Sequence, residues 1–375
     1  MNPIGMSLEE NKLPMKKIVI VCPHPKDQAP GQRLKYEQYI ENWELNGFDV
    51  VLKPFMTDRF WNIVYKKGHF IEKIFWTLYG YIRRFILLFT LRRYDVSYIF
   101  LWVTPFGATF FERMYCFVSK KVIYDIDDLV YHKDHKSEAN SFMAILKGRS
   151  KPILLMKKAH HVITCTPHLD NFVRQFNNNT SDISSTINTD TYVPVNTYSN
   201  ENQLTIGWSG SHSTSKYVYL LKEILLDLAK TYDFRLLVIG DPTFHIEGLD
   251  CESIRWVEET EVRDLQRIDI GIYPLPDEEW VLGKSGLKAL QYMALGIPTI
   301  ASAIGANYRV IEDGISGSLV KTDEEWKKAF EMYLVNPELR KTHGLKARTR
   351  VEELYSVKAN EPRYLKVINE VIQYK

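Results

Sequence analysis

The stretch Gly283–Ser302, GKSGLKALQYMALGIPTIAS, decides the fold that we expect for this chain. It predicts a helix that begins at Gly286 and ends at Gly296, because glycine is favoured just past a helix end. Pro298 then opens a short apolar run typical of a buried strand. Another apolar run, DIGIYPL (269–275), comes before the helix and predicts a second strand. Strand, loop, helix and strand in this order are typical of a parallel sheet covered by helices.

The same alternation fills both halves of the chain. It restarts near residue 203 after a polar stretch, and 375 residues suit two domains better than one. We therefore expect an α/β protein with two Rossmann-like, doubly wound domains facing a central cleft. The segments expected as strands are 16–23, 48–55, 96–102, 121–127 and 160–166 in the first half, and 203–210, 234–240, 253–257, 269–275 and 298–302 in the second; helices are expected at 32–47 and 215–232.

The domain limits follow from the polar runs between these segments. The final segment 361–375 reads as a helix with Pro362 at its start. We place a hinge near residues 194–203. The predicted units are a leader over 1–15, a first domain over 16–196, a second domain over 203–355 and a C-terminal helix over 356–375.

Composition excludes several classes of protein. The net charge of +2 gives the whole molecule no strong electrostatic preference for nucleic acid or anionic lipid, so local patches must carry any such preference. The four cysteines are scattered, with no C-x-x-C pair, so we expect neither a disulfide framework nor a zinc site, and a reducing cytoplasm fits them. Residues 1–15 lack the apolar core of a signal peptide. His160 and His161 have no ligand partner at metal spacing, so no metal is expected.

The residues around the helix start at Gly286 indicate an anion site. A helix N-terminus exposes unpaired N–H groups and about half a positive charge. Glycine lets a phosphate approach the backbone closely, and Lys284 and Lys288 add full charges. The GKS triplet is not a P-loop, because Glu278 stands where that motif needs its first glycine. The alternative is an ordinary turn with solvated lysines.

The stretch resembles the donor-site segment of glycosyltransferase family 4, retaining nucleotide-sugar transferases of GT-B fold. APGQRLKYEQY, VIYDIDDLVY and TIGWSGSHSTSKYVYLL also resemble segments of its bacterial polysaccharide members. The resemblance extends from KKIVIVCP to the C-terminal helix, which it implies returns toward the first domain. It also implies a first domain on the acceptor side, a second domain that binds the nucleotide sugar, and no cofactor or metal.

Within this segment the resemblance assigns roles to individual residues. Lys284 and Lys288 would stabilise the departing diphosphate, beside the helix start at Gly286 and Leu287. Gln291 stands where the family has a glutamate that holds the ribose, and an amide can still bond a diol. Gly283 stands where the family has its other glutamate, near the sugar.

The turn GWSGSH (207–212) departs from the family in a second way. The family usually places an arginine and a lysine here, both on the diphosphate, and the arginine is missing. Ser209 and the backbone at Gly210 remain as donors to phosphate. Glu258, beyond the strand that carries Trp256, is placed beside the base by the resemblance, with a solvated acidic turn as the alternative.

Three residues of the first half are expected to face the cleft. Gly31 and Arg33 follow the first strand, where open α/β sheets bind ligands. Gly31 would let the donor sugar or the departing phosphate approach closely, and Arg33 would reach a phosphate; the alternative is a plain turn with Arg33 on a solvated helix face. Asp127 ends YDIDD (124–128) and aligns with a family position that touches the donor sugar; it would orient a hydroxyl or take the acceptor proton. Helix capping is the alternative role for one of these aspartates.

Residues 59–93 combine eight basic residues with one acid, Glu72, and a stripe of apolar residues at helical spacing. Charges interrupt the stripe, so it is no transmembrane helix. It fits either an anionic membrane surface or a core-packing helix with a solvated basic face.

The observations favour a glycosyltransferase, and the resemblance implies a retaining, hexosyltransferase-type enzyme. It would move a sugar from a UDP or GDP donor to a hydroxyl of a glycan or lipid-linked acceptor, in bacterial surface polysaccharide or glycoconjugate synthesis at the cytoplasmic membrane face. A catalytically silent nucleotide-sugar binder or assembly partner stays open because of Gly283 and the missing arginine. A nicotinamide-dependent oxidoreductase is disfavoured, because the first strand is followed by PHPKDQAPG and not by G-x-G-x-x-G.

Overall fold

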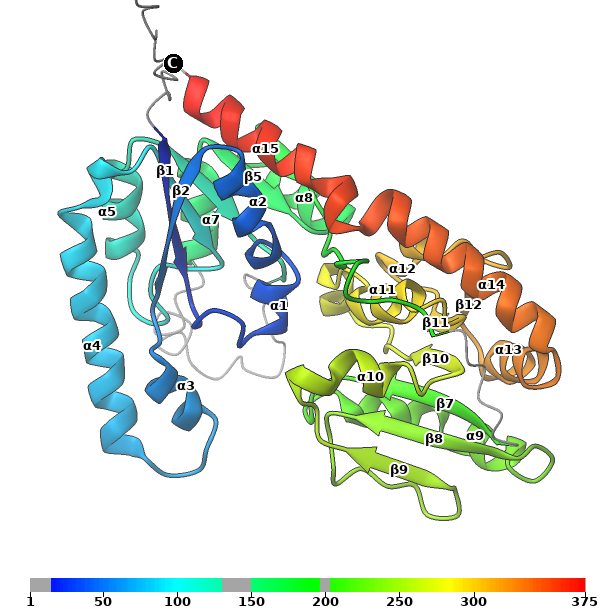
Figure 1. Ribbon diagram of the computed structural model, residues 1–375. Coiled ribbons are helices and arrows are strands. Elements are labelled where there is room, and N and C mark those ends of the chain that lie inside the picture. Colours follow the sequence, from blue (N-terminus) through cyan, green and yellow to red (C-terminus); the bar gives the residue numbers. More distant parts are fainter. Residues whose placement is uncertain (1–14, 130–149, 196–202, 375) are drawn as a thin grey trace, which may run out of the picture.

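The computed structural model describes residues 15–129, 150–195 and 203–374. Within these ranges lie two parallel six-stranded sheets, each flanked by helices, in an α/β arrangement (Figure 1). This confirms the expected fold class. The leader and the centre of the hinge fall outside the described residues, so the domain limits stay predictions.

The first sheet has the order β2-β1-β3-β4-β5-β6. Ile18–Cys22 in β1, an interior strand next to the edge strand β2, is completely buried, as expected for a parallel strand covered on both faces. Its strands are β1 (Lys16–Cys22), β2 (Phe48–Pro54), β3 (Val96–Phe100), β4 (Val122–Asp125), β5 (His161–Thr164) and β6 (Thr180–Asp182). The helices are α1 (Pro30–Arg33), η1 (Glu37–Tyr39), α2 (Ile40–Leu45), α3 (Asp58–Val64), α4 (Phe70–Leu88), η2 (Leu91–Arg93), α5 (Phe110–Val118), α7 (Ser150–Lys158) and α8 (Pro167–Val173).

The second sheet has the order β12-β11-β10-β7-β8-β9, which is the Rossmann order when its strands are counted from β7. Its strands are β7 (Leu204–Ser209), β8 (Phe234–Ile239), β9 (Cys251–Ile254), β10 (Ile270–Tyr273), β11 (Thr299–Ser302) and β12 (Gly317–Val320). The helices are η4 (Ser215–Leu221), α9 (Lys222–Leu228), η5 (Glu258–Thr260), α10 (Glu261–Leu265), η6 (Glu279–Gly283), α11 (Leu287–Ala294), α12 (Asn307–Val310), α13 (Asp323–Val335), α14 (Pro337–Arg350), the π-turn η7 (Val351–Tyr355) and α15 (Val357–Gln373).

The C-terminal helix α15 crosses back to the first sheet, as expected (Figure 1). Its Tyr364 packs in the core of the first domain, with its ring centroid 4.5 Å from that of Tyr39. The prediction that Pro362 opens this helix is wrong. The hydroxyl of Ser356 accepts a hydrogen bond from the Ala359 N–H at 3.0 Å and caps the helix earlier, so Pro362 lies inside it.

Two other helix predictions are corrected. The segment 32–47 is broken into α1, η1 and α2, and 215–232 begins as the 3-10 helix η4 before α9. In the first case Lys35 turns inward, with its side chain fully buried and its Nζ 2.8 Å from the Asp125 carboxylate. The spacing of apolar residues along a helix does not predict a buried ion pair of this kind. The polar run 176–192, where no strand was expected, contains the short edge strand β6.

Candidate functional site

A cavity of about 600 Å³ lies between the two sheets, at the carboxyl ends of their strands. Open parallel sheets bind ligands at these ends, where the strand order reverses. The first domain contributes the loops after β1 and β4, and the second contributes those after β7 and β10. The predicted site residues that line it are Gly31, Asp127, Ser209, Gly210, Lys284, Leu287, Lys288 and Gln291.

Two lysines give the second-domain wall its positive charge. Lys288 Nζ lies 5.6 Å and 5.5 Å from the ring centroids of Trp208 and Tyr273. Burial and the nearby charge of Lys284 lower the pKa of Lys288 to about 8. Lys284 Nζ lies 2.6 Å from a carboxylate oxygen of Asp128, across the cavity. An anion that enters the cavity therefore meets two ammonium groups. That of Lys288 is desolvated, and that of Lys284 is paired with the Asp128 carboxylate, which the anion can replace.

The start of α11 lies beside these lysines. Leu287 and Lys288 form its first turn, whose N–H groups have no acceptor within the helix. Gly286 itself does not line the cavity. Its φ of 78° and a virtual Cβ only 3.0 Å from Val310 Cγ2 explain the glycine by backbone conformation and packing.

The first-domain wall presents a carboxylate, Asp127. Burial raises its pKa to about 7; the Lys35 ammonium opposes this rise and the Asp128 carboxylate reinforces it. A Cβ on Gly31 would lie 2.8 Å from Asp127 Oδ2, so the glycine leaves room for this side chain at the cavity. Such a group exchanges a proton near neutral pH.

Arg33 and Glu258 do not line the cavity. The Arg33 guanidinium lies 2.5 Å from Glu261 and 3.5 Å from Glu258, and it packs over the Trp256 ring at 5.5 Å. These contacts link the two domains at the cavity rim. In this structure the arginine is thus engaged by carboxylates and not directed at a phosphate position.

Glu261 was missed by sequence reasoning, although it lines the cavity and is almost fully buried. Its carboxylate accepts hydrogen bonds from Gln291 Nε2 at 3.1 Å and from the Trp256 indole at 3.0 Å. This neighbour explains why residue 291 is an amide: a glutamate there would face another buried carboxylate. Glu261 begins α10 shortly after the acidic residues Glu258 and Glu259, and sequence alone cannot distinguish it from a solvated carboxylate.

Gly283 also has a structural explanation. A Cβ at this position would lie 2.5 Å from Leu129 Cγ and 3.0 Å from the Leu129 backbone nitrogen. The first-domain loop that carries Asp128 thus occupies the space in which a longer side chain would stand. No carboxylate reaches the cavity from position 283.

His212 is a second cavity residue that the sequence analysis did not single out. Its Nδ1 lies 2.9 Å from Asp241 Oδ1, and its side chain is 78% exposed. Asp241, just past β8, is itself fixed by the Ser215 hydroxyl at 2.6 Å and by Thr243. The pair therefore holds an imidazole at the turn where the expected arginine is missing. A lone histidine in a turn gave no signal until Asp241 was placed beside it.

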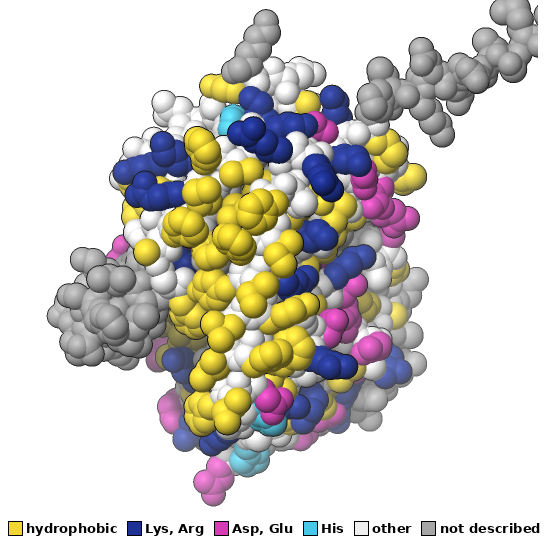
Figure 2. Space-filling model, turned by 90° about the vertical axis from the view of Figure 1, so that its left-hand side faces the viewer, with side chains coloured by type: hydrophobic (Ala, Val, Ile, Leu, Met, Phe, Trp, Pro, Cys, Tyr) yellow, Lys and Arg dark blue, Asp and Glu magenta, His cyan; other side chains and the backbone are white. Residues whose placement is uncertain are grey.

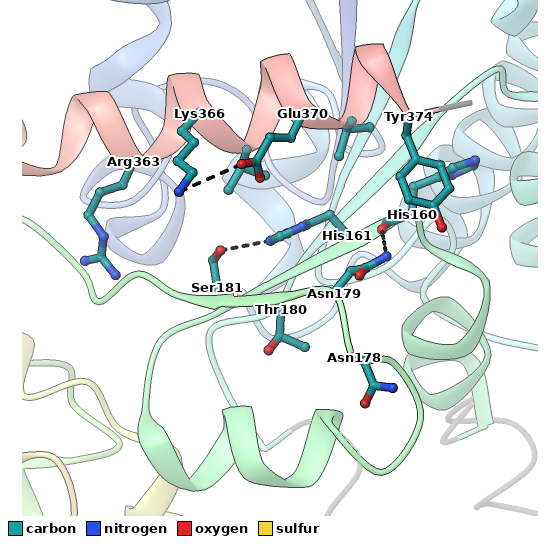
Figure 3. Close-up of a pocket in the computed structure, with 12 residues that line it drawn as sticks. His160, His161, Asn178, Asn179, Thr180, Ser181, Arg363, Lys366, Glu370 and Tyr374 are labelled. Carbon is teal, nitrogen blue, oxygen red and sulfur yellow. Dashed lines mark hydrogen bonds and ion pairs between the residues drawn. The ribbon is translucent and has the colours of Figure 1, made fainter.

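Among the described residues, no group of three or more His, Cys, Asp or Glu side chains is arranged to hold a metal ion. A second cavity of about 600 Å³ lies between α15 and the β5–β6 edge (Figure 3). Its polar groups pair locally: His161 Nε2 lies 2.9 Å from Ser181 Oγ, and Lys366 lies 3.8 Å from Glu370. This second cavity has no helix start flanked by lysines, and it is not formed between the loops of the two sheets as the first cavity is.

Residues 203–336, a little over a third of the chain, match the family model described as glycosyl transferases group 1. No curated protein matches the chain.

Solved structures match almost the whole chain. A glycosyltransferase from Rickettsia africae ESF-5 matches with a TM-score of 0.70 and 15% identity, over 96% of this chain and 100% of that one. Sucrose-phosphate synthase from Thermosynechococcus elongatus matches at 0.69 and 17%, over 96% and 100%. Anabaena Alr3699/HepE in complex with UDP and glucose matches at 0.64 and 13%, over 95% and 99%. Taken with the family match, these similarities in fold support a GT-B glycosyltransferase whose second domain matches the glycosyl transferases group 1 family.

Proposed function

We propose that this protein transfers a sugar from a nucleoside-diphosphate donor, UDP or GDP, to a hydroxyl of a glycan or lipid-linked acceptor. The observation that carries the proposal is the opposition of Lys284 and Lys288 to Asp127 across one cavity. Cations and a helix start suit a departing diphosphate, and a carboxylate suits the hydroxyl that replaces it. The UDP and glucose bound by the Anabaena protein of similar fold support this donor class.

Each wall has a part in the proposed reaction. The diphosphate lies against Lys284, Lys288, His212 and the first turn of α11, with Ser209 and Gly210 beside it. It accepts the electron pair of the broken sugar–oxygen bond, and the nearby positive charges stabilise it. Asp127 receives the proton of the acceptor hydroxyl as the new bond forms. Gln291 and Glu261 supply polar groups for the ribose.

The proposal has three further parts. The enzyme retains the configuration of the sugar, it uses a hexosyl donor, and it acts in bacterial surface polysaccharide or glycoconjugate synthesis on the cytoplasmic side of the membrane. These parts rest on the family resemblance. No cofactor or metal is assigned, because donor chemistry at this site is served by side chains and a helix terminus.

Thermal unfolding with UDP, GDP, ADP, CMP or NADH tests the proposal. A nucleotide at about a hundred times its dissociation constant stabilises the protein by roughly 2.7 kcal/mol. We expect a shift with UDP or GDP that Lys284→Ala combined with Lys288→Ala abolishes. The control is Lys321→Ala combined with Lys328→Ala. It removes two exposed lysines elsewhere in the second domain and should leave the shift unchanged. A shift with NADH alone, or with no nucleotide, would refute the proposal.

A second candidate is a nucleotide-sugar binder without catalysis. It is favoured by Leu129, which fills the space beside Gly283. Release of UDP or GDP from a nucleotide sugar in the presence of an acceptor pool separates the two. Binding without turnover across hydroxyl acceptors supports the binder.

A further inference from the structure

The outward face of helix α4 carries an apolar stripe that nothing in the described chain covers. Counted at 100° per residue, six large side chains point within about 60° of one direction. Each is between 55% and 85% exposed: Ile71, Phe75, Leu78, Ile82, Ile86 and Phe89. Figure 2 shows this face as a continuous band of hydrophobic side chains along the helix. Exposed apolar surface of this extent on one element marks an interaction site.

The opposite face of α4 is already anchored, so the stripe is not a misplaced core face. Gly80 lies so close to Phe55 that a Cβ would be 2.6 Å from its ring. The buried Arg84 guanidinium donates hydrogen bonds to the carbonyls of Val103, Lys53 and Cys22 at 2.8, 2.6 and 2.8 Å. Arg84 is therefore a structural residue, and its charge does not belong to the surface.

The surface cations lie at both ends of the stripe. Lys66 and Lys67 precede the helix and Arg92 and Arg93 follow it, all exposed. Counted at 100° per residue, Arg83 lies about 100° from the direction of the stripe. Figure 2 shows basic side chains gathered at the upper end and along one edge of the band. A helix of 19 residues is about 28 Å long, so these cations frame an apolar strip of that length.

We propose that this face, the α4 stripe with its basic ends, lies on an anionic lipid bilayer. Apolar side chains would enter the acyl boundary while the lysines and arginines contact acidic headgroups. No helix in the described ranges is long and apolar enough to cross a bilayer. If α4 lies in the plane of the membrane, the cations at both of its ends reach the headgroups of the same leaflet.

A second copy of the chain fits this face less well. Two stripes packed together, parallel or antiparallel, would place Lys66 and Lys67 beside a cationic end of the other copy. Like charges at both ends oppose such a contact, whereas an anionic surface is complementary to all of them.

The orientation also serves the proposed transfer. Helix α3 supplies Trp61 to the cavity wall and leads directly into α4 (Figure 1). A bilayer against α4 therefore contacts the first domain, which the family resemblance places on the acceptor side. Membrane binding does not itself depend on sugar transfer, and it has its own readout.

Flotation of the full-length protein with vesicles tests the proposal. Vesicles of phosphatidylcholine with phosphatidylglycerol are compared with phosphatidylcholine alone. We expect the protein to float with the anionic vesicles, less so as salt is raised. Phe75→Ser with Leu78→Ser and Ile82→Ser should weaken binding at least tenfold. Lys66→Gln, Lys67→Gln, Arg92→Gln and Arg93→Gln together should do the same, since each cation contributes about fivefold.

The matched control is Leu45→Ser with Leu220→Ser and Leu345→Ser, three exposed leucines away from α4, which should float like the wild type. Unchanged melting temperature and an unchanged UDP or GDP shift in the α4 variants separate loss of lipid binding from unfolding and from failure of the proposed function. Equal flotation with neutral vesicles, no flotation, or full flotation of the serine variant would overturn the proposal. So would a wild-type dimer that the serine variant dissociates.

Discussion

The two walls of the cleft are built on similar sheets but carry opposite charges. Six parallel strands support each wall, and both present loops from strand carboxyl ends. The first-domain wall offers Asp127, whereas the second offers Lys284, Lys288 and the start of α11. Because the two sheets are similar, the fold determines where a ligand lies, whereas a few loop residues determine the chemistry of the site. Four experiments test this division between an acidic wall for the acceptor and a basic wall for the donor.

The largest effect is expected from Asp127→Asn. An amide cannot take the acceptor proton, so kcat should fall by about 10²–10⁴ while the UDP or GDP dissociation constant changes little. Steady-state kinetics with nucleotide titration measure both. Asp190→Asn, at an exposed position, is the control. Equal losses in nucleotide binding and turnover would assign Asp127 to the donor and break the comparison.

Gln291→Glu tests the buried amide that donates a hydrogen bond to Glu261 within the second-domain wall. A carboxylate at this position faces Glu261, so we expect a loss of about 2–3 kcal/mol in unfolding free energy at neutral pH. Urea unfolding measures it. Adding Glu261→Gln should restore most of the stability, while the exposed Gln373→Glu should cost little. A stable single variant would mean that the Gln291–Glu261 contact does not decide the residue.

His212→Ala tests the missed member of the basic wall. It removes the proposed donor to the diphosphate, and hydrogen bonds to charged groups are worth about 1.5–3 kcal/mol. Nucleotide affinity should therefore fall at least roughly tenfold, measured by calorimetry. His245→Ala, at an exposed histidine outside the cavity, serves for comparison. An unchanged dissociation constant would remove His212 from the donor site.

The smallest effect is a pH dependence. The pKa of Lys288 is lowered to about 8, so its positive charge is lost as the pH rises through that value. Donor affinity should fall several-fold above about pH 8, somewhat later if bound diphosphate stabilises the ammonium. Lys288→Arg keeps its charge and should flatten the profile. If donor affinity depends on pH in the same way in the wild type and in Lys288→Arg, Lys288 does not contact the bound anion.

Much of this arrangement could be predicted without coordinates. Apolar runs located the central strands, and glycine and lysine around α11 located one wall of the cavity. The short edge strand β6 escaped because TSD carries no apolar run. The inward position of Lys35 within the broken segment 32–47 could not be predicted, because its partner Asp125 lies 90 positions away in the chain.

Patterns among neighbouring residues are enough to predict the alternation of strands and helices, the lysine-flanked helix start and the apolar spacing of α4. The pairings across the fold need the tertiary structure: Asp127 lines the same cavity as the lysines, Glu261 accepts a hydrogen bond from Gln291, and Asp241 pairs with His212. The tertiary structure also decided that the α4 stripe points outward. Such pairings depend on which strand ends and helix faces meet in space, and burial then sets the proton affinity of each group.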